Sequence, residues 1–206
     1  MKRGIKYALL GFIAIAVGGA TYVLNFGLYP RFFDISWDEE VQLHDGQVIV
    51  VHVKRTFERR SRSDRWLAYD RDTEVTFDAG PPWGRISRNF ERYDVNMIEN
   101  RDGRWYFGLD VTTGFPPKTL IDRAYPVLIL EKDGVERSAA SWDDIPDFPR
   151  QNMMPVTPSP EGIAPFANSL LTWQVKMEHW KNNPRAAGDS GLIIQRHVNK
   201  KQAENK

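Results

Sequence analysis

A run of 23 uncharged residues, from 7 to 29, constrains this chain more than any other feature. Three basic residues precede it: Lys2, Arg3 and Lys6. As a helix the run would span roughly 34 Å, slightly more than the ~30 Å hydrocarbon core of a bilayer. Basic flanks stay on the cytoplasmic side of a membrane. The sequence therefore predicts a single-pass anchor in the lipid of the inner (cytoplasmic) membrane. Residues 1–6 would lie in the cytoplasm and the rest of the chain in the periplasm or outside the cell.

A cleaved signal peptide is the alternative for the same segment. Its basic region would come first, and Gly18-Gly19-Ala20 would supply the small residues of a cleavage site. The apolar run continues for nine residues past Ala20, which a cleaved signal does not need. This length favours a retained anchor, and both interpretations export the rest of the chain.

The exported part has the composition of a folded domain. Aromatic residues make up 12% of the chain, too many for a disordered segment. Beyond the three N-terminal basic residues, 25 basic and 27 acidic residues remain. So near-neutral a domain gives no electrostatic reason to expect nucleic acid as a partner. The lack of cysteine excludes a lipoprotein-type acyl attachment, thiol catalysis and cysteine zinc sites.

Three Asp-Gly pairs indicate three β-hairpins: Asp45-Gly46, Asp102-Gly103 and Asp133-Gly134. Glycine accepts the positive φ of a tight turn, and the flanking segments are rich in β-branched and aromatic residues. The paired strands are expected at residues 35–43 and 47–57, 92–99 and 104–112, and 126–131 and 135–139. A seventh strand is expected at residues 73–77, before Gly80-Pro81-Pro82. The predicted fold class is mainly β, an antiparallel hairpin-rich sheet domain over residues 34–150.

The character of the chain changes after this domain. Residues 151–163 form a proline-rich connector. Residues 164–181 follow helical periodicity, with one apolar stripe: Phe166, Leu170, Trp173, Met177 and Trp180. We expect this C-terminal amphipathic helix to pack its stripe on the sheet; a partner helix or a membrane surface is the alternative. The residues expected to face away are Gln174, Lys176, Glu178 and Lys181. Within the C-terminal unit 164–198, residues 192–198 are expected to form a last strand, and residues 199–206 a frayed tail.

Residues 36–59 (SWDEEVQLHDGQVIVVHVKRTFER) carry a resemblance. The segment resembles the opening of a group of bacterial envelope proteins, in which a Trp-acid-acid strand and a His/Ser-Asp-Gly turn follow an N-terminal export segment. The resemblance implies export and a β-rich fold. It implies no activity, so no functional residue is transferred from it.

A basic patch within residues 54–65 is the one candidate binding feature. Its six basic residues are Lys54, Arg55, Arg59, Arg60, Arg62 and Arg65. As a loop the patch could meet anionic headgroups, lipopolysaccharide phosphates or an acidic partner surface. The favoured interpretation is a solvated loop, and Asp70, Asp72 and Glu74 could neutralise its charge internally.

Two acidic clusters and one serine motif are interpreted as structural features rather than as catalytic or metal-binding sites. Asp38 and Glu40 share one face of the expected strand and Glu39 the other, and a solvated face is the favoured interpretation of all three. The group Asp143, Asp144 and Asp147 lacks calcium-loop spacing and is expected to cap a turn. The tetrapeptide at residues 188–191 (GDSG) has no suitable upstream histidine context for a serine protease and is expected to be a turn.

The sequence therefore predicts no catalytic, cofactor-binding or metal-binding residue. The favoured hypothesis is a non-enzymatic, membrane-tethered envelope domain that binds or scaffolds another envelope component. One alternative is an envelope hydrolase whose site is assembled from loops. Another is a subunit of a larger membrane complex, with the anchor and the apolar stripe buried against partners. The oligomeric state is left open.

Overall fold

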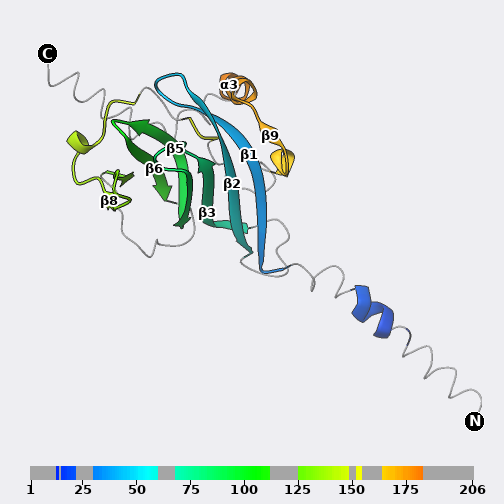
Figure 1. Cartoon of the computed structure of the whole chain (residues 1–206). Coiled ribbons are helices and arrows are strands. Elements are labelled where there is room, and N and C mark those ends of the chain that lie inside the picture. Colours follow the sequence, from blue (N-terminus) through cyan, green and yellow to red (C-terminus); the bar gives the residue numbers. More distant parts are fainter. Residues whose placement is uncertain are drawn as a thin grey trace, which may run out of the picture.

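The computed structural model describes residues 13, 15–21, 30–59, 68–111, 125–148, 152–154 and 164–182. It is built mainly from β-strands arranged in two sheets, antiparallel except for β9, which Figure 1 shows packed as layers. The first sheet has the order β4-β3-β2-β1-β9 and the second the order β5-β6-β7-β8. The predicted fold class is thus confirmed at the level of a mainly antiparallel β domain.

The strand bounds follow the chain. The first sheet contains β1 (Phe32–Gln42), β2 (Val48–Arg59), β3 (Ala68–Asp78), β4 (Arg85–Glu91) and β9 (Leu170–Leu171). The second contains β5 (Tyr93–Arg101), β6 (Arg104–Val111), β7 (Val127–Leu130) and β8 (Glu136–Ser138). The remaining elements after β1 are two 3-10 turns, η2 (Trp142–Asp144) and η3 (Ala164–Phe166), and the helix α3 (Trp173–Asn182).

The three predicted hairpins are confirmed. β1 pairs with β2, β5 with β6 and β7 with β8, each antiparallel. Gly46, Gly103 and Gly134 have φ of 89°, 69° and 83°, the left-handed region that glycine enters without a steric penalty. In the second hairpin Asp102 also has a positive φ of 54°, as a two-residue type I′ turn requires.

The structure differs most from the predicted strands at β3 and β4. The strand expected at residues 73–77 begins five residues earlier, at Ala68. β4 was not predicted, because only Ile86 and Phe90 are buried among its polar neighbours. It leads directly into β5 through Arg92, whose φ of 65° is unusual for a residue other than glycine.

The main core lies between the two sheets. Alternate residues of each strand point inward, as the two-residue period of a strand dictates. Phe77 of β3 contacts Trp105 and Phe107 of β6, with ring centroids 4.8 and 6.5 Å apart. A second cluster covers the other face of the β5–β8 sheet and includes Met97, Tyr106, Ile129, Ile145 and Phe148. That sheet is therefore buried on both faces.

The C-terminal helix differs from the prediction in its length and in the residues that it buries. The helix is limited to α3, and Leu170 belongs to β9, which pairs in parallel with β1. The apolar stripe is not one buried face: Leu170 is 50% exposed and Met177 is 38% exposed. Lys176, expected to face solvent, is completely buried instead. The structure describes the backbone of Trp180 but not its side chain. Residues 192–206 lie outside the described residues.

The predicted anchor is not shown by the structure. Residues 15–21 are helical, and most of the remaining run lies outside the described residues. Among the residues that are described, no helix has both the length and the apolar character needed to cross a bilayer. The transmembrane anchor and its orientation stay predictions.

Candidate binding site at the turn end of the sandwich

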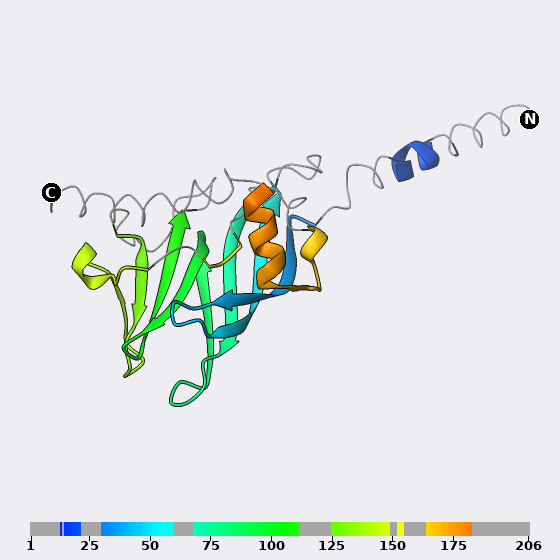
Figure 2. The same cartoon turned by 90° about the horizontal axis from the view of Figure 1, so that it is seen from above.

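All four hairpin turns lie at one end of the two sheets, which we call the turn end. They comprise residues 43–47, 79–84, 102–103 and 131–135. The register requires this: Val51, just after the first turn, pairs with Phe77, just before the second. Arg92 reverses the chain at the opposite end, so β5 returns to the turn end. Figure 2 shows the turns gathered on the side of the sheets away from the start of β1.

Aspartate side chains fix three of these turns. Asp45 Oδ1 accepts the Gln47 N–H at 2.9 Å, Asp78 Oδ1 accepts the Gly80 N–H at 2.9 Å, and Asp133 Oδ1 accepts the Val135 N–H at 3.1 Å. Each bond mimics a backbone turn and limits the conformations of the loop. The turn end therefore presents ordered loops on a rigid sheet scaffold, the usual setting of a binding surface.

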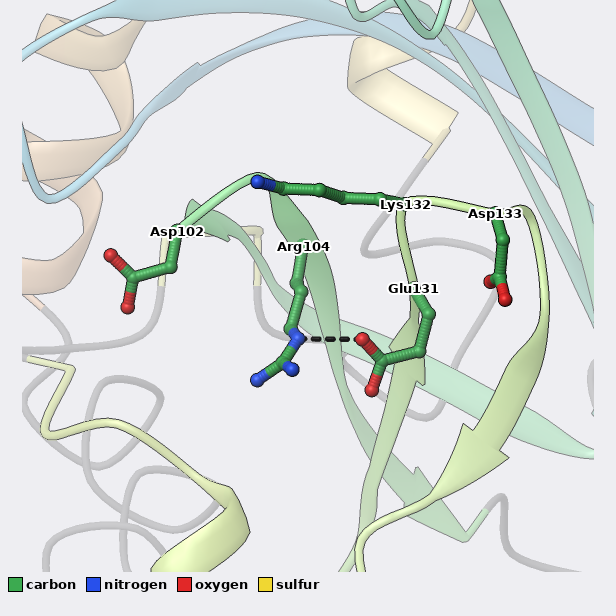
Figure 3. Close-up of a pocket in the computed structure, with 5 residues that line it drawn as sticks. All are labelled: Asp102, Arg104, Glu131, Lys132 and Asp133. Atoms are coloured by element: carbon green, nitrogen blue, oxygen red, sulfur yellow. Dashed lines mark ion pairs between the residues drawn. The ribbon is translucent and has the colours of Figure 1, made fainter.

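A polar depression of about 500 Å³ opens at the turn end between the third and fourth turns. Its lining residues, drawn in Figure 3, are Asp102, Arg104, Glu131, Lys132 and Asp133. Arg104 Nε lies 2.5 Å from Glu131 Oε2. The other oxygen of this carboxylate is 2.9 Å from Arg137 Nε. The depression is thus wide, solvent-exposed and largely neutralised by its own ion pairs.

A smaller cavity of about 170 Å³, the neutral cavity, lies on the other side of the Asp102-Gly103 turn. It is lined by Gln47, Ile49, Ala79, Pro81, Pro82, Trp83, Asn100, Gly103 and Trp105. None of these residues carries a charge. Trp83 is half-buried, and Trp105 is buried with an indole Nε1 that has no hydrogen-bond partner in the described part of the chain.

One buried and one half-buried carboxyl have raised pKa values, and neither lines the depressions described above. Burial raises the pKa of Glu99, offset in part by bonds from the His44 N–H and ring, 3.0 and 3.1 Å away. Burial also raises the pKa of Asp94 well above its usual value, and the nearby Asp70 carboxylate adds to this while Arg55 opposes it. Glu99 is buried on the face of β5 that it shares with Tyr106, and Asp94, whose side chain is 16% exposed, faces Arg55 and Asp70.

A buried polar chain starts at Glu99 and runs along the edge of β5, through Asn152, to Lys176 and Glu39. Asn152 Nδ2 donates to Glu99 Oε1 at 3.1 Å and to the Ile98 carbonyl at 2.6 Å. The Asn152 carbonyl accepts Lys176 Nζ at 2.7 Å. Lys176 Nζ is also 3.7 Å from Glu39 Oε1. Because every member has a partner, the chain of contacts explains how these groups tolerate burial.

The basic patch is not one surface in the structure. Arg55 is buried, with Nη1 2.8 Å from Asp70 Oδ2 and 3.0 Å from Asp94 Oδ1. Lys54 points to the other face of β2, as the strand period dictates, and pairs with Asp34 at 3.0 Å. Arg59 Nη1 donates to the Pro30 carbonyl at 2.7 Å.

The predicted internal neutralisation therefore holds for Arg55 and Asp70, and Arg55 is not available to an outside anion. The three other arginines of the patch, Arg60, Arg62 and Arg65, lie outside the described residues.

The acidic clusters divide between core and surface. Asp38 and Glu40 lie on the outer face, where Asp38 Oδ1 is 2.7 Å from His52 Nδ1. Glu39 is a correction to the solvated-face interpretation, because it is fully buried and accepts the Trp37 Nε1–H at 3.0 Å. Asp144 Oδ2 accepts the backbone N–H groups of Ala140 and Ser141, which confirms the predicted turn and lowers the pKa of Asp144. No His, Asp or Glu cluster suited to a metal ion occurs in the described ranges.

The residues of the neutral cavity were not singled out from the sequence. Gln47 and Trp83 lie within turns and Asn100 lies two residues before one, and antiparallel hairpins that follow one another along the chain tend to place their turns at one end. This placement of the turns was the one signal for the cavity that the sequence offered. The size and neutrality of the cavity depend on contacts between turns far apart in the sequence.

Comparisons with protein-family models, with curated proteins and with solved structures found no match for the chain. The site is therefore interpreted from its own geometry.

Proposed function

We propose that this chain is a non-enzymatic, membrane-tethered envelope domain that binds another envelope component through its turn end. The observation that carries the proposal is the position of the four turns opposite Pro30, where the N-terminal run joins the domain. β1 has 11 residues, so the turn end stands roughly 35 Å from the start of the sheet. A domain tethered at one end would present the other to the envelope.

The end that would face the membrane supports the same orientation. The Arg31 and Arg71 guanidinium carbons lie 5.4 and 5.3 Å from the centre of the Phe32 ring, which is 45% exposed. Arg59 lies 4.1 Å above the Phe33 ring. Arginine and aromatic side chains together suit the boundary between headgroups and water. The proposed location is the inner membrane, with the N-terminus in the cytoplasm.

Site-specific photo-crosslinking in intact bacteria tests the proposal. A benzoylphenylalanine is placed in the full-length chain at Asp102 or Lys132, on the turn end, and at Asn89, an exposed position on the outer face of β4, as the matched control. We expect crosslinked envelope components from the two turn-end positions and none from Asn89. Equal crosslinking from Asn89, or none from the turn end, would contradict the proposal.

A subunit of a larger membrane complex is a second candidate. The observation in its favour is the exposure of Leu170 and Met177, which were expected to be covered by their own chain. A crosslinker at Leu170 addresses it in the same experiment. Crosslinks from Leu170 without any from the turn end would favour this candidate over the first.

A further inference from the structure

The neutral cavity has a composition that restricts its ligand. It offers two tryptophans, two prolines and two amide side chains, with no charge. An uncharged lining gives an ionic ligand nothing to replace its lost hydration, so the ligand is neutral. The volume of about 170 Å³ is below the roughly 300–1,000 Å³ of sites that enclose a drug-sized ligand. The cavity therefore has room for about one ring.

Trp105 is the buried part of the cavity lining. Trp105 lines the cavity and is only 3% exposed, yet its Nε1–H has no hydrogen-bond partner among the described residues. A buried donor without an acceptor is costly, and buried tryptophan N–H groups usually have a partner. Because this nitrogen is closed to solvent, Trp105 contributes an apolar wall to the cavity rather than a hydrogen-bond donor.

We propose that the neutral cavity binds one ring of a neutral glycan, an inference that rests on the proposed binding function of the turn end. A sugar ring combines an apolar C–H face, which packs on an indole, with hydroxyl groups that both donate and accept hydrogen bonds. The half-buried Trp83 provides most of the aromatic surface, since Trp105 is only 3% exposed. The amides of Gln47 and Asn100 each provide donors and an acceptor, as paired hydroxyls require.

A proline-rich peptide is the rival ligand, because aromatic-lined grooves also bind polyproline helices. The backbone of such a peptide offers carbonyl acceptors, so it needs hydrogen-bond donors from the site. The amide oxygens of Gln47 and Asn100 would then receive no hydrogen bond from the peptide. The hydroxyl groups of a sugar can accept hydrogen bonds from each amide N–H and donate to each amide oxygen. The two amides at the cavity therefore favour the sugar.

The test is a tryptophan-fluorescence titration of the full-length protein, in a detergent without a sugar headgroup. The probes are the neutral tetrasaccharides of β-linked glucose, α-linked glucose and N-acetylglucosamine, with octaproline as the rival. We expect saturable binding of at least one tetrasaccharide and none of octaproline. Binding of octaproline alone, or of none of the probes, would overturn the inference.

Three variants locate the binding. Trp83→Ala removes most of the exposed aromatic surface and should weaken tetrasaccharide binding by about twofold to tenfold, given the energy of an aromatic contact. Gln47→Ala should weaken it less, and because the Gln47 side chain is exposed, the substitution leaves the core intact. Trp142→Ala, at a half-buried tryptophan that packs on Tyr125 away from the turn end, is the matched control and should bind normally. Unchanged binding in both cavity variants would overturn the inference.

The outcome separates this inference from the proposed function. If Asp102 and Lys132 crosslink to an envelope component while no tetrasaccharide binds, the turn end is a binding surface and the glycan inference fails. If neither experiment succeeds, both fail.

Discussion

Lys176 on α3 places its Nζ 3.7 Å from Oε1 of Glu39 on β1, and both side chains are completely buried. The lysine also donates to the Asn152 carbonyl, and the carboxylate accepts N–H groups from Trp37 and Met154. The pair therefore joins the C-terminal helix to the inner face of the first sheet. It fixes the position of α3 although the helix lacks one continuous apolar face.

Removing one member of this pair should destabilise the domain strongly. Lys176→Met leaves the buried Glu39 carboxylate without its cation, which costs about 3–5 kcal/mol in comparable buried pairs. Urea unfolding of the full-length protein measures the loss. The double variant with Glu39→Gln should lose less than the sum of the two single variants, because it strands no charge. Additive losses would show that the two side chains are not energetically coupled.

The raised pKa of Asp94 predicts a specific pH dependence. A carboxyl whose pKa is raised in the folded state stabilises the fold fully below its unfolded pKa, near 3.8, and loses this contribution as the pH rises through the folded value. Asp94→Asn imitates the protonated form. The stability of this variant relative to the wild type should therefore increase as the pH rises above 3.8, as followed by urea unfolding between pH 4 and 8.

Glu58 supplies the control of opposite sign. Burial favours a higher pKa, but hydrogen bonds from Arg31 and Arg71 outweigh it and lower the pKa of Glu58. The stability that Glu58 contributes is present above its unfolded pKa of about 4.5 and is lost as the pH falls through the lowered value. Glu58→Gln should therefore cost most at neutral pH and least in acid. The same pH trend in both variants would show that the carboxyls do not differ as described.

The elements predicted correctly are those whose determinants are local. Each Asp-Gly pair carries its own turn chemistry, so the hairpins could be predicted from short segments. β4 has no such signal, because the reversal before β5 occurs at Arg92, a residue that rarely adopts positive φ.

The errors arose where contacts between residues far apart in the sequence determine the structure. Asn168 has a φ of 57°, and the following residues pair with β1 rather than continuing a helix. Local periodicity cannot detect this strand, nor can it show that Glu39 and Lys176 compensate each other's charge across more than 130 residues of sequence. Arg55 was assigned to a surface patch for the same reason: its partners Asp70 and Asp94 lie on other strands.

The hairpin glycines should be sensitive to substitution. Gly134 has a φ of 83° and no atom close to the position of an added Cβ, so backbone strain alone is tested there. Gly134→Val should destabilise by about 1–3 kcal/mol, the cost of a residue forced into a disfavoured backbone region. Gly134→Asn is the control and should cost less, because asparagine tolerates this region. Equal losses from both substitutions, measured by urea unfolding, would argue against a positive φ at this turn.

The neighbouring leucines of β9 provide the sharpest test of how the C-terminal segment is placed. Leu171 is 2% exposed and packs in the core between the sheets, whereas Leu170 is 50% exposed on the opposite face. Leu171→Ala should therefore cost about 2–5 kcal/mol, from lost burial and a residual cavity. Leu170→Ala should change the free energy of unfolding by no more than about 0.5 kcal/mol. The two variants remove the same atoms from adjacent positions, so composition and helix propensity cannot explain a difference between them. A larger loss of stability from Leu170→Ala than from Leu171→Ala would show that Leu170 is buried, as the predicted apolar stripe requires. It would also contradict the pairing of β9 with β1 in the register Asp38 to Leu170 and Glu39 to Leu171.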